Sequence, residues 1–219
     1  MKNIWLNMVL FALIVIEISY LHMPKILHEV LGIMLAVMTV IHILVNRRRL
    51  VLLTKNVTAR KIFSLTVVIA MMVCMSIIFV SGILVSNYLF TDFISFDLHQ
   101  NITMHQLHLS LPYIMMILVS MHIGLHLQEL TKAIKDWLGL SEFGMWRRII
   151  FTTFIAVMMI GGEVWLILNR VADRIAMKHI FGTAAATLPP TVFVLMIVGT
   201  IILFAAITFV IDKKFLRRR

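Results

Sequence analysis

Residues 26–45 read ILHEVLGIMLAVMTVIHILV, and this stretch decides the fold. It carries a single acid, Glu29, and is long enough for a helix to cross the hydrocarbon core of a bilayer, which takes about 20 apolar residues. It also holds two histidines, His28 and His42. Because ionisable side chains are costly inside a membrane, they favour a functional interpretation there. The stretch therefore predicts a membrane-spanning helix with a polar function.

The rest of the chain has the same apolar character. Of its 219 residues, 61% are hydrophobic and 14% are charged, against about 45–50% and 25% in soluble domains. This composition excludes a soluble globular domain, a disordered chain and a disulfide scaffold. Six segments are expected to span the membrane, all as helices, because lipid-exposed backbone must satisfy its own hydrogen bonds. They are Ile4–Leu21, Ile26–Val45, Ile62–Leu89, Leu107–Leu127, Ile149–Leu168 and Thr191–Ile211.

Basic residues are divided unevenly between the two sides of these spans. With the N-terminus inside, 16 of the 20 Lys and Arg residues fall on the cytoplasmic side, as the positive-inside rule requires. We therefore expect a multi-pass protein of a bacterial plasma membrane with both termini in the cytoplasm. The same distribution explains the net charge of +10 without a nucleic-acid partner.

Four of the nine histidines form two pairs with identical spacing. His28 and His42 lie 14 residues apart in the second span, and so do His108 and His122 in the fourth. At about 100° and 1.5 Å per residue, 14 positions return to nearly the same helix face about 21 Å further along. Both spans run from outside to inside. We therefore expect His28 with His108 to bind an outer haem iron and His42 with His122 an inner one, as bis-histidine ligands.

Two neighbouring histidines compete for these positions. His126 lies one turn beyond His122 and is the chief alternative ligand of the inner haem; otherwise it is expected to contact a haem propionate or lie at the interface. His105 lies one turn before His108 and is a weaker candidate. A histidine inside a membrane can also hydrogen-bond a neighbouring helix or take part in a proton relay.

Other polar and small residues leave further alternatives open. Glu17 and Glu163, in the outer halves of the first and fifth spans, either carry protons beside a quinone site or lie at the interface or paired with a neighbour. Gly32 and Gly124 either let a porphyrin approach the backbone or reflect the ordinary frequency of glycine in membrane helices. The third span is long enough to tilt or to contain a loosened stretch at Ser81-Gly82. Three histidines are expected to be solvated loop residues: His22, His99 and His179.

Residues 27–32 (LHEVLG) with His42, and residues 122–126 (HIGLH) with His108, resemble a bacterial family of small di-haem b-type membrane cytochromes. This family is related in plan to the cytochrome b γ subunits of respiratory dehydrogenases and to ferric-reductase transmembrane domains. The resemblance covers the first four spans well and the last two loosely. It implies a haem-binding four-helix bundle with the ligands His28, His42, His108 and His122.

The expected fold is accordingly an all-α integral membrane protein with six transmembrane helices. Residues 1–128 are expected to form the four-helix di-haem bundle, 129–148 a cytoplasmic linker, and 149–219 two peripheral helices with a basic tail. The inner loops contain no GxGxxG or other nucleotide motif. Electrons are therefore expected to come from a quinol or a separate flavoprotein.

The expected function is electron transfer across the membrane through two haems b, to an acceptor at the opposite face. The chain would act as a ferric-reductase-like oxidoreductase or as the electron-transfer subunit of one, with the lipid bilayer and a quinone or redox protein as partners. Two other classes stay open. One is a histidine-based transporter of metal, protons or haem, and the other is a membrane anchor for a redox partner.

Overall fold

The computed structural model describes residues 4–93, 101–138, 144–178 and 183–216, which form helices and no strand. Five helices are long and apolar enough to cross a membrane, and α1 is a shorter apolar helix of 15 residues. The chain is therefore an all-α membrane protein, as expected. The helices are α1 (Ile4–Ile18), η1 (Tyr20–His22), α2 (Lys25–Leu53), α3 (Ala59–Leu84), η2 (Thr91–Phe93), α5 (Ile102–Leu125), α6 (Leu127–Leu138), α7 (Met145–Leu168), α8 (Val171–Ile175), η3 (Ala184–Thr187), α9 (Pro190–Ile211) and η4 (Asp212–Leu216).

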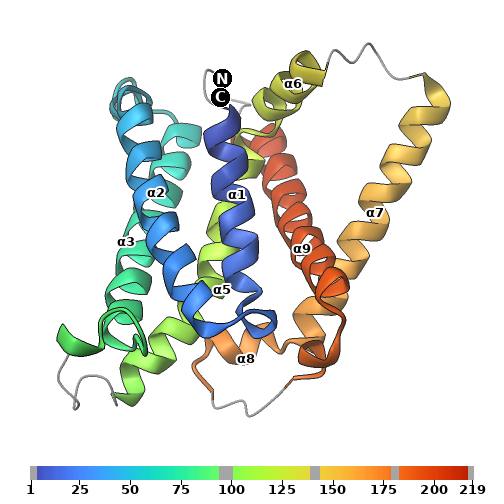
Figure 1. Ribbon diagram of the computed structural model, residues 1–219. Coiled ribbons are helices and arrows are strands. Elements are labelled where there is room, and N and C mark those ends of the chain that lie inside the picture. The colour runs from blue at the N-terminus through green and yellow to red at the C-terminus, as the bar shows by residue number, and fades with distance from the viewer. Residues whose placement is uncertain (1–3, 94–100, 139–143, 179–182, 217–219) are drawn as a thin grey trace.

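The apolar helices run alternately in opposite directions between two ends of the molecule (Figure 1). One end, called the α6 end, holds α6, the start of α1 and the end of α9. The other, called the α8 end, holds α8 and η1. Helices α2 and α5 both run from the α8 end to the α6 end, so they are parallel, as the sequence predicted. Helix α6 occupies part of the segment that was expected to be a linker.

Helix α5 is at the centre of the packing. Its Met116 belongs to a core shared with α1, α7 and α9, and its Val119 belongs to a second core shared with α1, α2 and α3. Helix α9 contributes Phe193 and Ile197, whose side chains are 1% and 0% exposed. Helix α9 is therefore part of the core, unlike the expectation that both last helices are peripheral. Helix α7 contacts chiefly α9 and lies at the periphery.

The carboxylate of Glu29 explains where α3 ends. This side chain of α2 accepts hydrogen bonds from the backbone N–H groups of Asn87, at 2.7 Å, and Leu89, at 2.9 Å. These N–H groups bind a carboxylate instead of a preceding carbonyl, so they do not continue the helix. Helix α3 therefore stops at Leu84 rather than at the expected Leu89, and it remains helical through the Ser81-Gly82 pair.

Helices α7 and α9 cross closely at two glycines. A Cβ atom added to Gly162 would lie less than 3.0 Å from the backbone of α9, and one added to Gly199 less than 3.0 Å from the backbone of α7. The hydroxyl of Thr200 donates a 3.0 Å hydrogen bond to the carbonyl of Gly162 across this crossing. Small residues allow membrane helices to approach closely, and here they attach α7 to the rest of the protein.

We expect Gly162→Leu to push α7 away from α9 and to destabilise the protein by about 1–3 kcal/mol or more, the usual cost of overpacking. Thermal unfolding in detergent, followed by tryptophan fluorescence, measures the change, because the buried Trp165 belongs to the same core. Gly161→Leu is the matched control, since nothing lies within 4 Å of its added Cβ. Equal losses of stability in the two variants would contradict this description of the crossing.

Candidate functional site

The structure brings His28 of α2 and His108 of α5 together near the α8 end. Their ring centroids are 6.0 Å apart and the ring planes are inclined by 71°. The two side chains come from parallel helices that are far apart in sequence. The proximity expected for this pair is therefore present.

The imidazole of His108 is held against α3 by its Nδ1 atom. This atom lies 3.1 Å from the backbone carbonyl of Ile78 and 3.4 Å from the hydroxyl of Ser81. Gly82 makes room for the ring, because a Cβ at this position would lie 2.8 Å from His108 Cε1. A proton on Nδ1 donated to the Ile78 carbonyl leaves Nε2 with a lone pair for a metal ion.

The imidazole of His28 is held by an acid from α1. Its Nδ1 lies 2.6 Å from Oε2 of Glu17, and the two side chains are 29% and 12% exposed. Of the two roles expected for Glu17, the structure therefore shows pairing with a neighbour. The contact occupies Nδ1 and leaves Nε2 of His28 as the nitrogen that could bind a metal ion, as in the arrangement at His108.

The second pair of histidines lies further along α2 and α5, toward the α6 end. His122 interacts electrostatically with His42 and with His126. The ring centroids of His122 and His126 are 5.0 Å apart. The Nδ1 atoms of His42 and His122 are buried and have no hydrogen-bond partner among the described residues.

Buried polar atoms that lack a partner within the described part of the chain gather around these histidines. Most of them belong to α1, α2 and α5, although the indole nitrogen of Trp165 and one nitrogen of His22 lie elsewhere. Leaving such atoms unpaired costs free energy, so each requires an explanation. Those along the three helices are Glu17 Oε1, His28 Nδ1, Thr39 Oγ1, His42 Nδ1 and His122 Nδ1; His28 Nδ1 has a short contact with Glu17 but not the geometry of a hydrogen bond.

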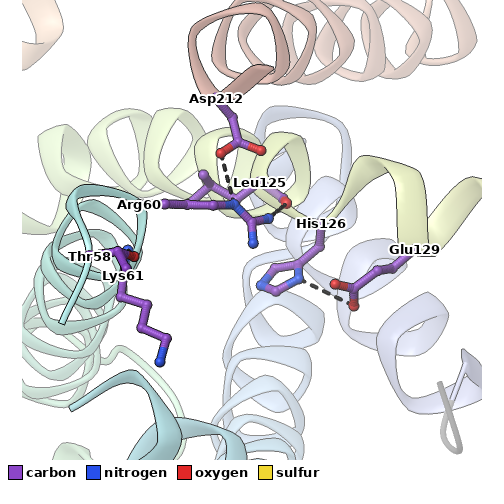
Figure 2. A network of polar contacts seen from close by, with 7 residues as sticks. All are labelled: Thr58, Arg60, Lys61, Leu125, His126, Glu129 and Asp212. Atoms are coloured by element: carbon purple, nitrogen blue, oxygen red, sulfur yellow. Dashed lines mark hydrogen bonds and ion pairs between the residues drawn. The ribbon is translucent and has the colours of Figure 1, made fainter. Parts of the chain in front are cut away.

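His126 lies beyond the last residue of α5 and belongs to a charged network (Figure 2). Its Nδ1 is 3.6 Å from Oε2 of Glu129. Beside it, Arg60 donates from Nε to Asp212 Oδ1 at 2.8 Å and from a terminal nitrogen to the carbonyl of Leu125 at 2.9 Å. Asp212 is fully buried. Like His28, His126 therefore has an acid beside its Nδ1. His122 interacts electrostatically with His42.

The remaining candidates fall into separate places. His105 is close enough to His108 to interact with it electrostatically, and its side chain is exposed. The ring of His22 packs 4.8 Å from that of Phe193 with Nε2 buried, so the expectation of a solvated residue is wrong. Glu163 is exposed on α7. The positions of two other histidines are outside the described residues: His99 and His179.

The two glycines singled out in the sequence have different surroundings. A Cβ on Gly124 would lie 2.5 Å from the carbonyl oxygen of Ala205, so this glycine serves the contact of α5 with α9 and not a porphyrin. Gly32 lies beside Glu17, whose Oε2 would be 3.9 Å from an added Cβ.

The donor set is of the kind that binds haem iron. Within the described residues, no group of three or more His, Cys, Asp or Glu side chains is arranged to hold a metal ion. A bis-histidine haem requires only two protein ligands per iron, and neutral imidazole suits it. The Nδ1 contacts of His28 and His108, together with the space at Gly82, fit such ligation.

Comparisons with family models, with curated proteins and with solved structures found no match to the chain. The interpretation of the site therefore depends on its own geometry.

Sequence reasoning did not find the residues that orient the imidazoles. The carbonyl of Ile78 has no sequence signal, and Gly82 stood out only as part of the Ser81-Gly82 pair. Glu17 gave a usable signal, as an acid within an apolar span, but its partner His28 depends on how α1 is rotated against α2. Arg60 was predicted only as a basic residue of the cytoplasmic side. Its contacts with Leu125 of α5 and with Asp212 after α9 were not predicted.

We expect Asp212→Asn to destabilise the protein by about 3 kcal/mol, the low end for breaking a buried ion pair, because Arg60 is 35% exposed. Chemical unfolding in detergent measures the loss. Asp173→Asn is the control, since this acid pairs with Arg170 and Lys178 at the surface, and these contacts hold its pKa below the usual value. If Asp212→Asn and the control variant are equally stable, the Arg60–Asp212 ion pair does not stabilise the α6 end as described.

Proposed function

We propose that this protein is a transmembrane electron carrier with two b-type haems, each bound by one histidine of α2 and one of α5. The proposed haem at the α8 end is held by His28 and His108, and that at the α6 end by His42 and His122. In this proposal α1, extended by η1, is a sixth span, and α1, α2, α3 and α5 surround the haems. The α6 end faces the cytoplasm of a bacterium.

The separation of His28 and His108 carries the proposal. Two imidazoles bound to one metal ion on opposite sides have ring centres about 6 Å apart, because each metal–nitrogen bond is about 2 Å and each nitrogen is about 1 Å from its ring centre. The observed separation is 6.0 Å. Nδ1 of His108 lies 3.1 Å from the Ile78 carbonyl and Nδ1 of His28 lies 2.6 Å from Glu17 Oε2, and these contacts support the orientation of Nε2 toward a ligand.

The residues of the chain would perform three tasks. Haem iron, when bound, supplies a one-electron couple, and two histidine ligands leave no open position for oxygen. His28 and His108 hold their orientation through Glu17 and the Ile78 carbonyl. The apolar side chains of α2 and α5 exclude water between the two histidine pairs, which are about 21 Å apart along each helix.

The distribution of charge supports the proposed orientation. The described basic residues that the sequence assigned to the cytoplasm lie around the α6 end, at the ends of α2, α6 and η4 and the starts of α3 and α7. The opposite end carries four: Lys25, Arg170, Arg174 and Lys178. A quinol or a separate flavoprotein remains the proposed electron donor, and the acceptor is proposed at the other face.

We expect the purified protein to contain two low-spin haems b per chain. His28→Ala and His108→Ala should remove the same spectral component, and His42→Ala and His122→Ala the other, because either ligand of a pair is needed to hold its haem. Reduced-minus-oxidised spectra and haem-to-protein ratios measure these losses. His126→Ala is the control and should retain both haems.

Three results would contradict this assignment. A protein without haem from haem-replete cells would instead favour a histidine-based transporter or an anchor for a redox partner. If His126→Ala loses the spectral component of the α6-end haem and His122→Ala retains it, His126 rather than His122 is the ligand of that haem. Grouping of His42 with His108 would be incompatible with the parallel course of α2 and α5.

We expect reporter fusions to place both termini in the cytoplasm. A fusion after Arg219 should report the cytoplasmic side, and an insertion within residues 94–100 the opposite side, because the positive-inside rule sets the orientation. Paired alkaline phosphatase and fluorescent-protein reporters measure this. The proposed topology has an odd number of membrane crossings between these two positions. Reporters that place both positions on the same side would contradict it.

A further inference from the structure

Glu17 is a buried acid whose environment is unusual for a membrane helix. Its side chain is 12% exposed, and Oε2 lies 2.6 Å from His28 Nδ1. Its second oxygen, Oε1, is buried and has no hydrogen-bond partner among the described residues. A carboxylate so far removed from water requires compensation by a positive charge or a strong donor. The imidazole of His28 is the group placed against it.

We propose that Glu17 is the positioning residue of His28 and that it makes the haem at the α8 end the lower-potential one of the two. The inference rests on the proposed function. Glu17 does not ligate the iron; it acts through the imidazole.

Two effects of Glu17 act in the same direction. A carboxylate that accepts the Nδ1–H proton fixes the ring and raises the basicity of the ligating nitrogen. Its negative charge would also act on an iron bound to His28 through a poorly screened environment. Both effects favour ferric over ferrous iron, because the ferric state carries the larger positive charge. The midpoint potential of this haem is therefore lowered.

The opposite end of the bundle has different charges around its histidines. Nδ1 of His42 and of His122 have no partner within the described residues. The neighbouring His126 interacts electrostatically with the acid Glu129 and with the cations Arg60 and Arg49, of which Arg60 is paired with Asp212. The second haem thus lacks a carboxylate on its ligands, so its potential is expected to be higher. Electrons would then settle at the α6 end.

Glu17→Gln tests this proposal, because glutamine has the same shape and still accepts a hydrogen bond but carries no charge. The midpoint potentials of both haems are measured by redox titration at one fixed pH, and the haem lost in His28→Ala identifies the α8-end component. We expect this component alone to shift upward, with at least a tenfold change in its ferric-to-ferrous ratio at a fixed ambient potential, equivalent to about 59 mV. The electron paramagnetic resonance signal of that haem should shift as well.

Glu163→Gln is the matched control, since it removes the same charge from an exposed position on α7 and should leave both potentials unchanged. If Glu17→Gln loses the haem, Glu17→Asp decides: retention of the haem with the charged residue supports the proposal, and loss in both variants assigns Glu17 a space-filling role.

The proposal is overturned if both haems are bound and Glu17→Gln leaves the potential of the α8-end haem unchanged or shifts both haems equally. That result would leave the proposed function intact. Absence of haem from the unmodified protein would instead remove the proposed function itself.

Discussion

Helix α5 packs against α3 and α9 at once, and this double contact positions the remaining helices. Met115 and Val119 face one core, whereas Tyr113 and Met116 face the other. Near the middle of α5, Asn169 donates to the hydroxyl of Tyr113 at 3.2 Å. At the C-terminal end of α5, the Arg60 guanidinium joins the carbonyl of Leu125 to Asp212, which directly follows α9. Because α5 also carries His108 and His122, any displacement of this helix would move half of the candidate ligands.

The sequence predicted most of the fold because the bilayer restricts what an apolar chain can do. Segments of about 20 apolar residues must be helices, and the helices begin close to the predicted positions. Their packing was harder to predict. The close contact of α9 with α5 depends on the small residue Gly124, whose added Cβ would lie 2.5 Å from the carbonyl oxygen of Ala205. The end of α3 depends on Glu29, a residue from another helix.

The candidate site was predictable to a similar extent. A spacing of 14 residues in two parallel helices was enough to place His28 near His108, because helix geometry carries position along the chain into position in space. The contacts that orient each ring were not predictable. They depend on the rotation of α1 and α3 about their own axes, which hydrophobic patterning determines poorly when all faces of a membrane helix are apolar. His22 was misjudged for a related reason, since its contact with Phe193 joins segments distant in sequence.

Two electrostatic effects oppose each other at His28, and their magnitudes decide the outcome. The positive end of α2 lies within one turn of His28, because the helix begins at Lys25. A helix terminus is equivalent to about half a positive charge, and its effect is screened where water reaches it. Glu17 contributes a full negative charge at 2.6 Å from the ring and is only 12% exposed. Energy between charges scales with their product and falls with distance and dielectric constant. The carboxylate therefore outweighs the helix terminus at His28.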